Sequence, residues 1–259
     1  MKISGPRLLV LAALAALLPL TACGGDGSSG AGGDGGTAST ITVLAASSLT
    51  GVFTELGKQF ESEHHGVTVT FAFDSSATLA QQAVGGAPAD VLATADQNTM
   101  DSAAQVQLTE PQVFATNRMV LVTPADNPAG ISSFSDLDSS SVHYVVCVTT
   151  APCGAVAAAL LDRNDVTGTP VSTEVDVKAV LAKVTEGEAD AGLVYRTDAI
   201  AAGGQVRSFP VPGSASQITT YPIVTLKQTR STSLSEAFVD LVTGTTGQQV
   251  LAKAGFGPP

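Results

Sequence analysis

The feature that most limits the fold of this chain is the alternation of strand-like and helix-like segments from Ile41 to the C-terminus. Apolar strand patterns lie at residues 41–45, 67–73, 91–94, 119–123, 142–148, 191–195 and 221–226. Helical spacing of apolar side chains occurs between them, at residues 49–60, 79–84, 155–161, 177–184 and 234–251. Such alternation predicts an α/β fold with mainly parallel sheets flanked by helices, as either an enzyme or a two-lobed binding protein.

The N-terminal residues indicate export. Lys2 and Arg7 precede an uncharged apolar run at 8–20, which ends in Leu-Thr-Ala-Cys at Cys23. This order is typical of a secretory signal, and it resembles the lipobox of bacterial lipoproteins. We therefore expect a signal peptide at 1–22 and a lipid on Cys23, which would hold the protein at the outer face of the cytoplasmic membrane. An uncut membrane anchor is the alternative, but the run is shorter than the roughly 20 residues that a span needs.

The segment that follows, 23–39, contains almost only small and polar residues, so we expect a flexible tether there. Its Gly-x-Gly-x-x-Gly pattern at 25–30 lacks the strand and helix that a dinucleotide site requires, and we discard it. The formal net charge of the whole chain is -11. An acidic surface of this kind argues against binding to nucleic acid or to anionic lipid.

Two further cysteines, Cys147 and Cys153, lie in the globular part. In an exported protein such a pair predicts a disulfide. A metal-binding pair and two free thiols are the competing interpretations. No third cysteine lies nearby in sequence, which argues against a metal.

The residues that an enzyme would need are missing from recognisable patterns. The sequence has no G-x-S-x-G elbow, no H-E-x-x-H helix and no P-loop. Of its three histidines, His64 and His65 follow a helical segment and His143 opens a strand. We therefore expect a protein that is not an enzyme.

Four predicted helices begin with small or hydroxyl-bearing residues or next to them. Ser47-Ser48, Ser75-Ser76, Pro152-Cys153-Gly154 and the segment 174–177 occupy these positions. The first N–H groups of a helix have no intrahelical partner and lie at the positive end of its dipole, so they can bind an anion without Lys or Arg. Ordinary capping explains any one of these serines. Only their combination indicates a site.

Several segments resemble, in sequence and in order, the molybdate-binding proteins of ABC importers. They are ITVLAASSLT at 41–50, FDSS at 73–76, GAPADV at 86–91, ADQ at 95–97, APCG at 151–154, GLVYRTDA at 192–199, YPI at 221–223 and GF at 255–256. The resemblance implies a two-lobed periplasmic-binding-protein type II fold in which the chain crosses twice between the lobes. We place the crossings near Met119–Thr123 and Tyr221–Thr225, with lobe 1 at 40–120 and 223–259 and lobe 2 at 121–222.

The resemblance also implies the ligand and its donors. Ser48 and Ser76 would each supply a hydroxyl and a backbone N–H, Cys153 and Val177 a backbone N–H, and Tyr195 its phenol. The ligand would be molybdate or tungstate, with no cofactor, and the partner a membrane permease of the ABC type. The protein would act as a monomer.

Two acidic residues depart from the family pattern beside these donors. Asp74 precedes the second serine turn and Asp176 adjoins Val177. Because either carboxylate would repel an anion, we expect both side chains to point away from the site. The segment Val148-Thr149-Thr150 also departs from the charged sequence usual there.

Three alternatives remain open. The same fold could bind sulfate or another small solute, the chain could be an exported hydrolase, or it could be a sensory module. Phosphate fits less well, because it keeps a proton near neutral pH and would need an acceptor that the five donors do not provide.

Overall fold

The computed structural model describes residues 39–259. The predicted signal peptide at 1–22, the lipidated Cys23 and the tether up to residue 38 lie outside the described residues. Ser39, which the sequence placed in the tether, instead opens the first strand, because it pairs with Val67 on the neighbouring strand. Within residues 39–259, no helix is long and apolar enough to cross a membrane.

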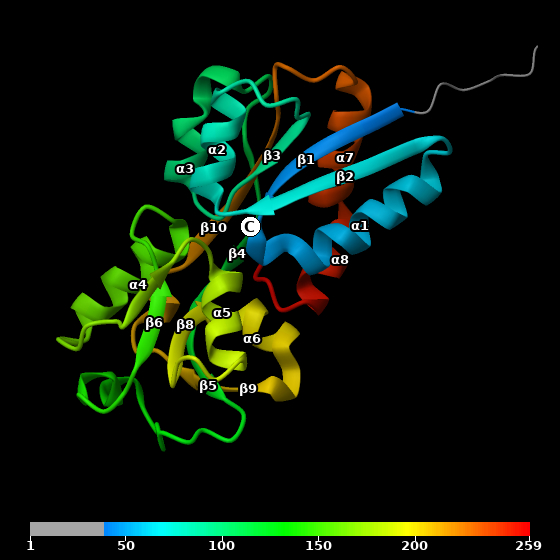
Figure 1. Ribbon diagram of the computed structural model, residues 1–259. Helices are drawn as coiled ribbons and strands as arrows, with labels where there is room; N and C mark the ends of the chain where they lie inside the picture. The colour runs from blue at the N-terminus through cyan, green and yellow to red at the C-terminus, as the bar shows by residue number, and fades with distance from the viewer. Residues whose placement is uncertain (1–38) are drawn as a thin grey trace, which may run out of the picture. The chain divides into compact units, whose positions relative to one another are not determined.

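The first of two five-stranded sheets has the order β2-β1-β3-β10-β4, and we call this sheet with its helices lobe 1 (Figure 1). Its strands are β1 (Ser39–Ala46), β2 (Val67–Asp74), β3 (Val91–Ala93), β4 (Gln112–Asn117) and β10 (Thr219–Thr225). Its helices are α1 (Thr50–Glu63), α2 (Ser76–Val84), α3 (Gln97–Ser102), α7 (Thr232–Thr243) and α8 (Thr245–Lys253), with 3₁₀ turns at Ser47–Leu49 and Ala104–Val106.

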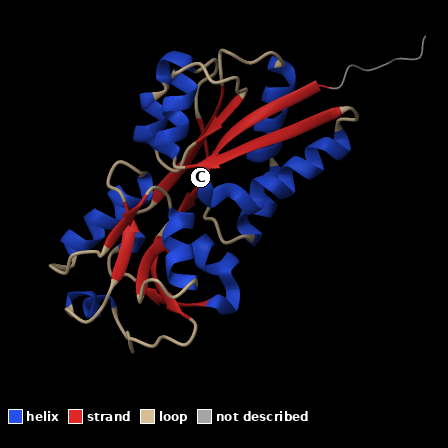
Figure 2. Ribbon diagram, in the orientation of Figure 1, coloured by secondary structure: helices blue, strands red, loops and turns tan. Residues whose placement is uncertain are grey.

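Both faces of this sheet are covered, as the alternation of its side chains requires. Ile41, Val43 and Ala45 of β1 pack into one core with α1, α7 and α8, whereas Leu44 packs into a second core with α2 and α3. Figure 2 shows the helices on both sides of the strands.

The second sheet has the order β7-β6-β8-β5-β9, and it forms lobe 2 with its helices. Its strands are β5 (Met119–Pro124), β6 (Tyr144–Cys147), β7 (Ser172–Glu174), β8 (Ala191–Tyr195) and β9 (Val206–Pro210). Its helices are α4 (Pro152–Arg163), α5 (Val177–Thr185) and α6 (Arg196–Ala202), with 3₁₀ turns at Phe134–Asp138, Gly203–Gln205 and Ser214–Ser216.

The two sheets are built on one plan, which confirms the predicted fold class. In each sheet four strands run in the same direction and the fourth strand in the order runs against them; these reversed strands are β10 and β5. Each reversed strand is the first strand after the chain leaves the other sheet.

The crossings between the sheets differ in detail from the prediction. The chain leaves lobe 1 at Arg118, next to the predicted Met119–Thr123. It returns between Pro210 and Thr219, so the predicted boundary at 222/223 falls inside β10, all of which pairs with lobe 1 strands. The apolar pattern of β10 predicts a buried strand but does not identify the sheet that it joins.

Some elements were not predicted from the sequence. The C-terminal helical region at 234–251 is two helices that break at Gly244, where a Cβ would lie 2.7 Å from the Asp240 carbonyl oxygen. The strands β4, β7 and β9 and the helices α3 and α6 were also missed, because each is short and has polar residues among or in place of apolar ones, so it shows no clear period.

Candidate functional site

The carboxyl ends of parallel strands converge between the lobes, which is where ligands bind in open α/β sheets. β1 leads into Ser47–Leu49 and α1, β2 into α2, β6 into α4, and β7 into α5. Figure 1 shows the arrowhead of β2 at the junction with lobe 2, and β1 runs parallel to it. Four helix starts therefore meet at one place, and α1, α2, α4 and α5 are each at least nine residues long.

A small cavity lies at this meeting point, and the structure brings all five predicted donors to its wall. Ser48 and Ser76 line it from lobe 1, and Cys153, Val177 and Tyr195 from lobe 2. The volume that the centre of a water molecule can occupy in this cavity is only about 10 Å³. Cavities for organic ligands of drug size usually measure about 300–1,000 Å³, so this one excludes them and has room for about one water-sized group as it stands.

The hydroxyl of Ser76 has one of its two functions already used. Its Oγ accepts a hydrogen bond from the Ala95 N–H at 2.9 Å, and the residue is buried. Its own proton remains available for a partner in the cavity. Ser76 is also the first residue of α2, where the backbone N–H has no intrahelical acceptor.

Tyr195 carries the clearest sign of a missing partner. Its ring is buried, and its hydroxyl has no hydrogen-bond partner of good geometry among the described residues, although the Thr219 side chain lies close to it. Burial raises the pKa of this phenol well above its usual value and Thr219 lowers it only slightly, so the group stays protonated and can donate. A buried polar group without a partner costs about 1–3 kcal/mol, and an anion in the cavity would remove that cost.

The start of α4 is held against the end of β6. Cys147, the last residue of β6, is joined by a disulfide to Cys153, the second residue of α4. At Gly154 an added Cβ would overlap the Val148 carbonyl oxygen, so only glycine allows this close approach. The Cys153 N–H is thereby placed at the cavity on a short, crosslinked turn.

Val177 opens α5, and its N–H stays free of the helix cap. The carboxylate of Asp176 accepts from the N–H groups of Lys178 and Ala179, at 2.7 and 3.1 Å. The first N–H of the helix, that of Val177, is not among the groups that this side chain uses. Val177 is buried in the wall of the cavity.

Asp74 and Asp176, which we expect to point away from the site, are both among the residues that line the cavity. Each carboxylate is bound to neighbouring backbone: Asp176 caps α5, and Asp74 Oδ1 accepts from the Ser75 N–H at 2.6 Å. These local hydrogen bonds keep both acids beside the helix starts. An anion in the cavity therefore meets N–H and O–H donors with two carboxylates close by.

One ion pair connects two of the elements behind the cavity. Lys178 Nζ of α5 lies 2.9 Å from Asp198 Oδ1 of α6, whose side chain is fully buried. Desolvation raises the pKa of Asp198, and the Lys178 ammonium opposes that rise. The pair links the helix that begins at Val177 to the helix that follows Tyr195.

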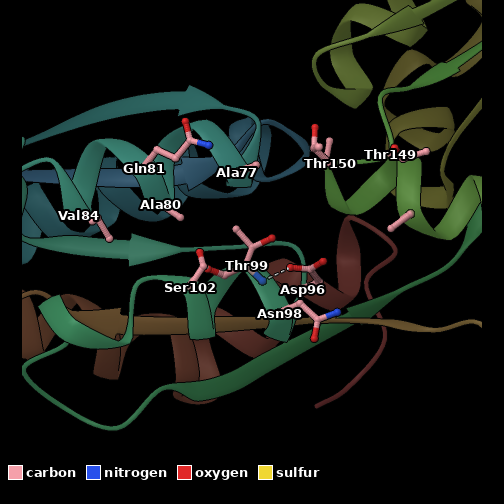
Figure 3. Close-up of a pocket in the computed structure, with 12 residues that line it drawn as sticks. Ala77, Ala80, Gln81, Val84, Asp96, Asn98, Thr99, Ser102, Thr149 and Thr150 are labelled. Carbon is pink, nitrogen blue, oxygen red and sulfur yellow. Dashed lines mark hydrogen bonds between the residues drawn. The ribbon is translucent and has the colours of Figure 1, made fainter.

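A wider cleft of about 430 Å³ adjoins the cavity. Figure 3 shows Gln81, Asp96 and Thr99 on its lobe 1 side and Thr149 and Thr150 on its lobe 2 side. Asp96 is occupied in capping α3 through the Thr99 N–H at 2.8 Å. The cleft is thus lined mostly by neutral polar and small side chains.

Two residues that the sequence reasoning missed stand directly behind Ser48. Its hydroxyl lies 3.0 Å from the hydroxyl of Tyr221, which in turn accepts from the Asn117 amide at 3.4 Å. Tyr221 was noted only as part of a strand and Asn117 not at all. No local pattern could have found them, since they lie 173 and 69 residues from Ser48.

The described residues do not assemble catalytic or metal-binding groups at the cavity. None of the residues lining it is a histidine. His64 stacks on Phe60 with ring centroids 4.0 Å apart, and His143 lies 3.5 Å from Asp190 on lobe 2. Within residues 39–259 no group of three or more His, Cys, Asp or Glu side chains could hold a metal ion.

Neutral donors around a small cavity between two α/β lobes define the class: an extracytoplasmic solute-binding protein. The chain belongs to the bacterial extracellular solute-binding protein family, which residues 41–257 match. It is 43% identical over 221 residues to the molybdate-binding protein ModA of Mycobacterium tuberculosis, which covers 85% of each chain. The resemblance to molybdate-binding proteins is therefore confirmed at the level of the family.

Solved structures support the fold. The periplasmic molybdate-binding protein of Azotobacter vinelandii superposes with a TM-score of 0.75 at 21% identity, over 85% of this chain and 99% of that one. The sulfate-binding protein SubI of M. tuberculosis also gives 0.75, at 17% identity, over 85% and 87%. Because similar folds carry different anions, the fold alone does not choose the ligand.

Proposed function

We propose that this protein captures molybdate or tungstate outside the cytoplasm, between its two lobes, and delivers it to an ABC importer. The observation that carries the proposal is the polarity of the cavity. Ser76 already accepts from the Ala95 N–H and still has its proton to donate, and the buried Tyr195 phenol has no hydrogen-bond partner of good geometry among the described residues. Both groups, with the N–H groups of Cys153 and Val177, suit a ligand whose oxygens all accept.

The charge state of the ligand follows from this polarity. Molybdate, tungstate and sulfate carry no proton near neutral pH, whereas phosphate keeps one and needs an acceptor. None of the five predicted donor groups is a carboxylate that could accept this proton, and the two acids that line the wall, Asp74 and Asp176, bond neighbouring backbone N–H groups through Oδ1. Neutral donors also cost less to desolvate than a buried Lys or Arg would.

We propose molybdate rather than sulfate as the ligand because of the relatives that are similar in sequence. The M. tuberculosis protein that is 43% identical is a molybdate-binding protein, while the sulfate-binding structure is similar only in fold. Sulfate remains the second candidate, since the same donors would bind it.

The test is calorimetric titration of the purified protein with molybdate, tungstate, sulfate and phosphate. We expect tight binding of the first two, weaker binding of sulfate and the weakest binding of phosphate. Tight phosphate binding, or binding of none of the four anions, would reject the proposed function.

We further propose that the anion enters through the wider cleft and that closure of lobe 2 on lobe 1 retains it. Donors from both lobes must reach one small ion, so the closed arrangement gains the contacts that the open one lacks. A decrease in the radius of gyration on adding molybdate, measured by small-angle scattering, is the expected result. No change would contradict closure.

Anchoring by a lipid on Cys23 is a separate proposal, which rests on the signal-like residues before it. A Cys23→Ser variant should no longer be found in the membrane fraction and should not be labelled by radioactive fatty acid. Continued labelling would place the lipid elsewhere.

A further inference from the structure

A chain of hydrogen bonds runs from the connection between the lobes to the cavity wall. It begins at Asn117, the last residue of β4 before the chain crosses to lobe 2 at Arg118. It passes through the hydroxyl of Tyr221 in β10 and ends at the hydroxyl of Ser48. All three residues are buried, at 5%, 0% and 7% exposure, so water cannot readily replace a link.

The orientation of the Asn117 amide is set by the backbone. The Arg118 N–H donates to Oδ1 of Asn117 at 2.9 Å, and a backbone N–H can only donate. The amide NH₂ group must therefore face the other way. Its two protons point to Thr197 Oγ1 of α6, at 2.8 Å, and to the Tyr221 hydroxyl, at 3.4 Å.

This orientation sets the direction of the remaining protons. The Asn117 amide can only donate to the Tyr221 oxygen, so within residues 39–259 Ser48 Oγ is the one partner left that can accept the Tyr221 proton. Ser48 Oγ then accepts from Tyr221 and turns its proton toward the cavity that it lines. With the opposite direction, Ser48 would donate to Tyr221 and present only lone pairs to the ligand, which would repel an unprotonated oxyanion.

We propose that Asn117, which touches no ligand, is a specificity-determining residue that makes Ser48 a donor and thereby selects unprotonated oxyanions over protonated ones. The inference rests on the proposed function, since it takes Ser48 as part of the anion site. Asn117 also donates to Thr197 of lobe 2, so the same amide connects the polarity of the site to the junction of the lobes. Burial raises the pKa of the Tyr221 phenol, so the hydroxyl that relays the hydrogen bond from Asn117 to Ser48 stays protonated over the whole working range of pH.

The test uses Asn117→Asp to reverse the direction of the hydrogen bonds from residue 117 through Tyr221 to Ser48, with anion affinities measured at pH 8. The introduced carboxylate can still accept from the Arg118 N–H, but its second oxygen accepts where the amide donated. The Tyr221 proton then turns toward that oxygen, Ser48 donates to Tyr221, and a lone pair of Ser48 faces the cavity. Hydrogen bonds to charged groups are strong enough that we expect the ratio of molybdate to hydrogen phosphate affinity to fall by at least about tenfold.

The ratio separates this effect from simple charge repulsion. Both anions are mostly doubly charged at pH 8, so an added negative charge weakens both alike and leaves their ratio unchanged. Gln205→Glu, at an exposed position of lobe 2, adds the same charge outside the chain of hydrogen bonds and should leave both affinities close to those of the wild-type protein.

A second variant keeps the test decisive if Asn117→Asp does not fold. Tyr221→Phe removes the link but keeps the ring that packs edge-on against Tyr195 and Phe256. It should lower the same affinity ratio several-fold. In the Tyr221→Phe background, Asn117→Asp should cause no further change in the ratio, because the chain is already broken.

Three results are decisive. An unchanged ratio in folded Asn117→Asp, or in folded Tyr221→Phe, overturns the inference while leaving molybdate binding intact. An equal effect of Asn117→Asp with and without Tyr221 also overturns it, because the effect would then not pass through the relay. Failure of the wild-type protein to bind any of the four anions rejects the proposed function first, and the inference with it.

Discussion

At the scale of single residues, the cavity is defined by hydroxyl groups whose protons have no acceptor among the described residues. The Tyr195 hydroxyl is buried without a partner among residues 39–259, and the Ser76 oxygen already accepts from Ala95. The unpartnered Tyr195 hydroxyl lowers the stability of the free protein. Both hydroxyls would gain an acceptor when an anion binds. Such a site trades stability for affinity.

Tyr195→Phe tests that trade. The variant should bind molybdate about 10- to 100-fold more weakly, because a hydrogen bond to a charged group is lost. Its melting temperature should stay the same or rise, since an unpartnered buried hydroxyl is removed. Calorimetry and thermal unfolding measure the two effects.

Tyr144→Phe is the matched control. That hydroxyl donates to the Gly168 carbonyl on lobe 2, away from the cavity. Its loss should lower the melting temperature and leave molybdate affinity unchanged. If Tyr195→Phe bound as tightly as the wild-type protein, the phenol would not be a ligand group.

Ser76→Ala should show a different combination. Molybdate affinity should fall by about tenfold or more, and stability should also fall by about 1 kcal/mol, because the buried Ala95 N–H loses its acceptor. Titration and urea unfolding measure both. Ser62→Ala, at an exposed position in α1, should change neither, and unchanged affinity in Ser76→Ala would remove Ser76 from the site.

At the scale of secondary-structure elements, affinity depends on how firmly the helix starts are held. The start of α4 is held by the disulfide to β6 and by the close approach at Gly154. The start of α5 is held by the Asp176 cap and by the Lys178–Asp198 pair with α6. A donor fixed before binding costs less entropy to order when the ligand arrives.

Removing the disulfide should weaken binding without removing a donor. In Cys147→Ala with Cys153→Ala, the residue 153 N–H is kept, and chain-entropy estimates give a loss of about 2 kcal/mol in stability for so short a loop. We expect a measurable fall in molybdate affinity along with a lower urea midpoint. Equal affinity would show that packing at Gly154 is enough to hold the turn, and free thiols found by mass spectrometry of the exported protein would remove the bridge itself.

The Lys178–Asp198 pair predicts a pH effect of known sign. Because burial raises the pKa of Asp198 in the folded protein, the folded state takes up a proton more readily than the unfolded chain as pH falls. The wild-type protein should therefore gain stability relative to Asp198→Asn as pH is lowered from 7 toward 4. Parallel urea unfolding of the two proteins measures the difference, and a constant difference would contradict the assigned cause.

At the scale of the whole molecule, an anion binder carries a net charge of -11. The charge lies mainly on the surface, whereas the predicted donors at the cavity are uncharged. Surface charge acts on the approach of the ligand over a distance that salt shortens, and the cavity acts at contact. The two properties are therefore compatible and separable.

Salt should accordingly speed binding. The association rate constant for molybdate should rise between about 10 and 150 mM salt, as screening weakens repulsion, while the dissociation rate changes little. Stopped-flow tyrosine fluorescence can follow the reaction, because the chain has no Trp. A rate that falls with salt would mean that a local positive potential outweighs the net charge.

The sequence by itself predicted the α/β fold class, and its resemblance to a family named five of the residues that line the cavity. Apolar periods report on elements that are long enough to repeat, and small or hydroxyl residues at helix starts report on free N–H groups, so both can be interpreted from neighbouring residues. Short elements such as β7 and the break at Gly244 escaped, because a few residues show no period. The local hydrogen bonds of Asp74 and Asp176, which fix both acids beside the helix starts, were not predicted.

Only the tertiary structure decided how the donors are aimed. That Tyr195 lacks a partner, that Ser76 is met by Ala95, and that Asn117 reaches Ser48 through Tyr221 depend on groups from distant parts of the chain. The sheet that β10 joins was decided in the same way, by pairing with β3 and β4. Local patterns report local energies, whereas the direction of a proton in a buried network depends on every partner that the completed fold brings within reach.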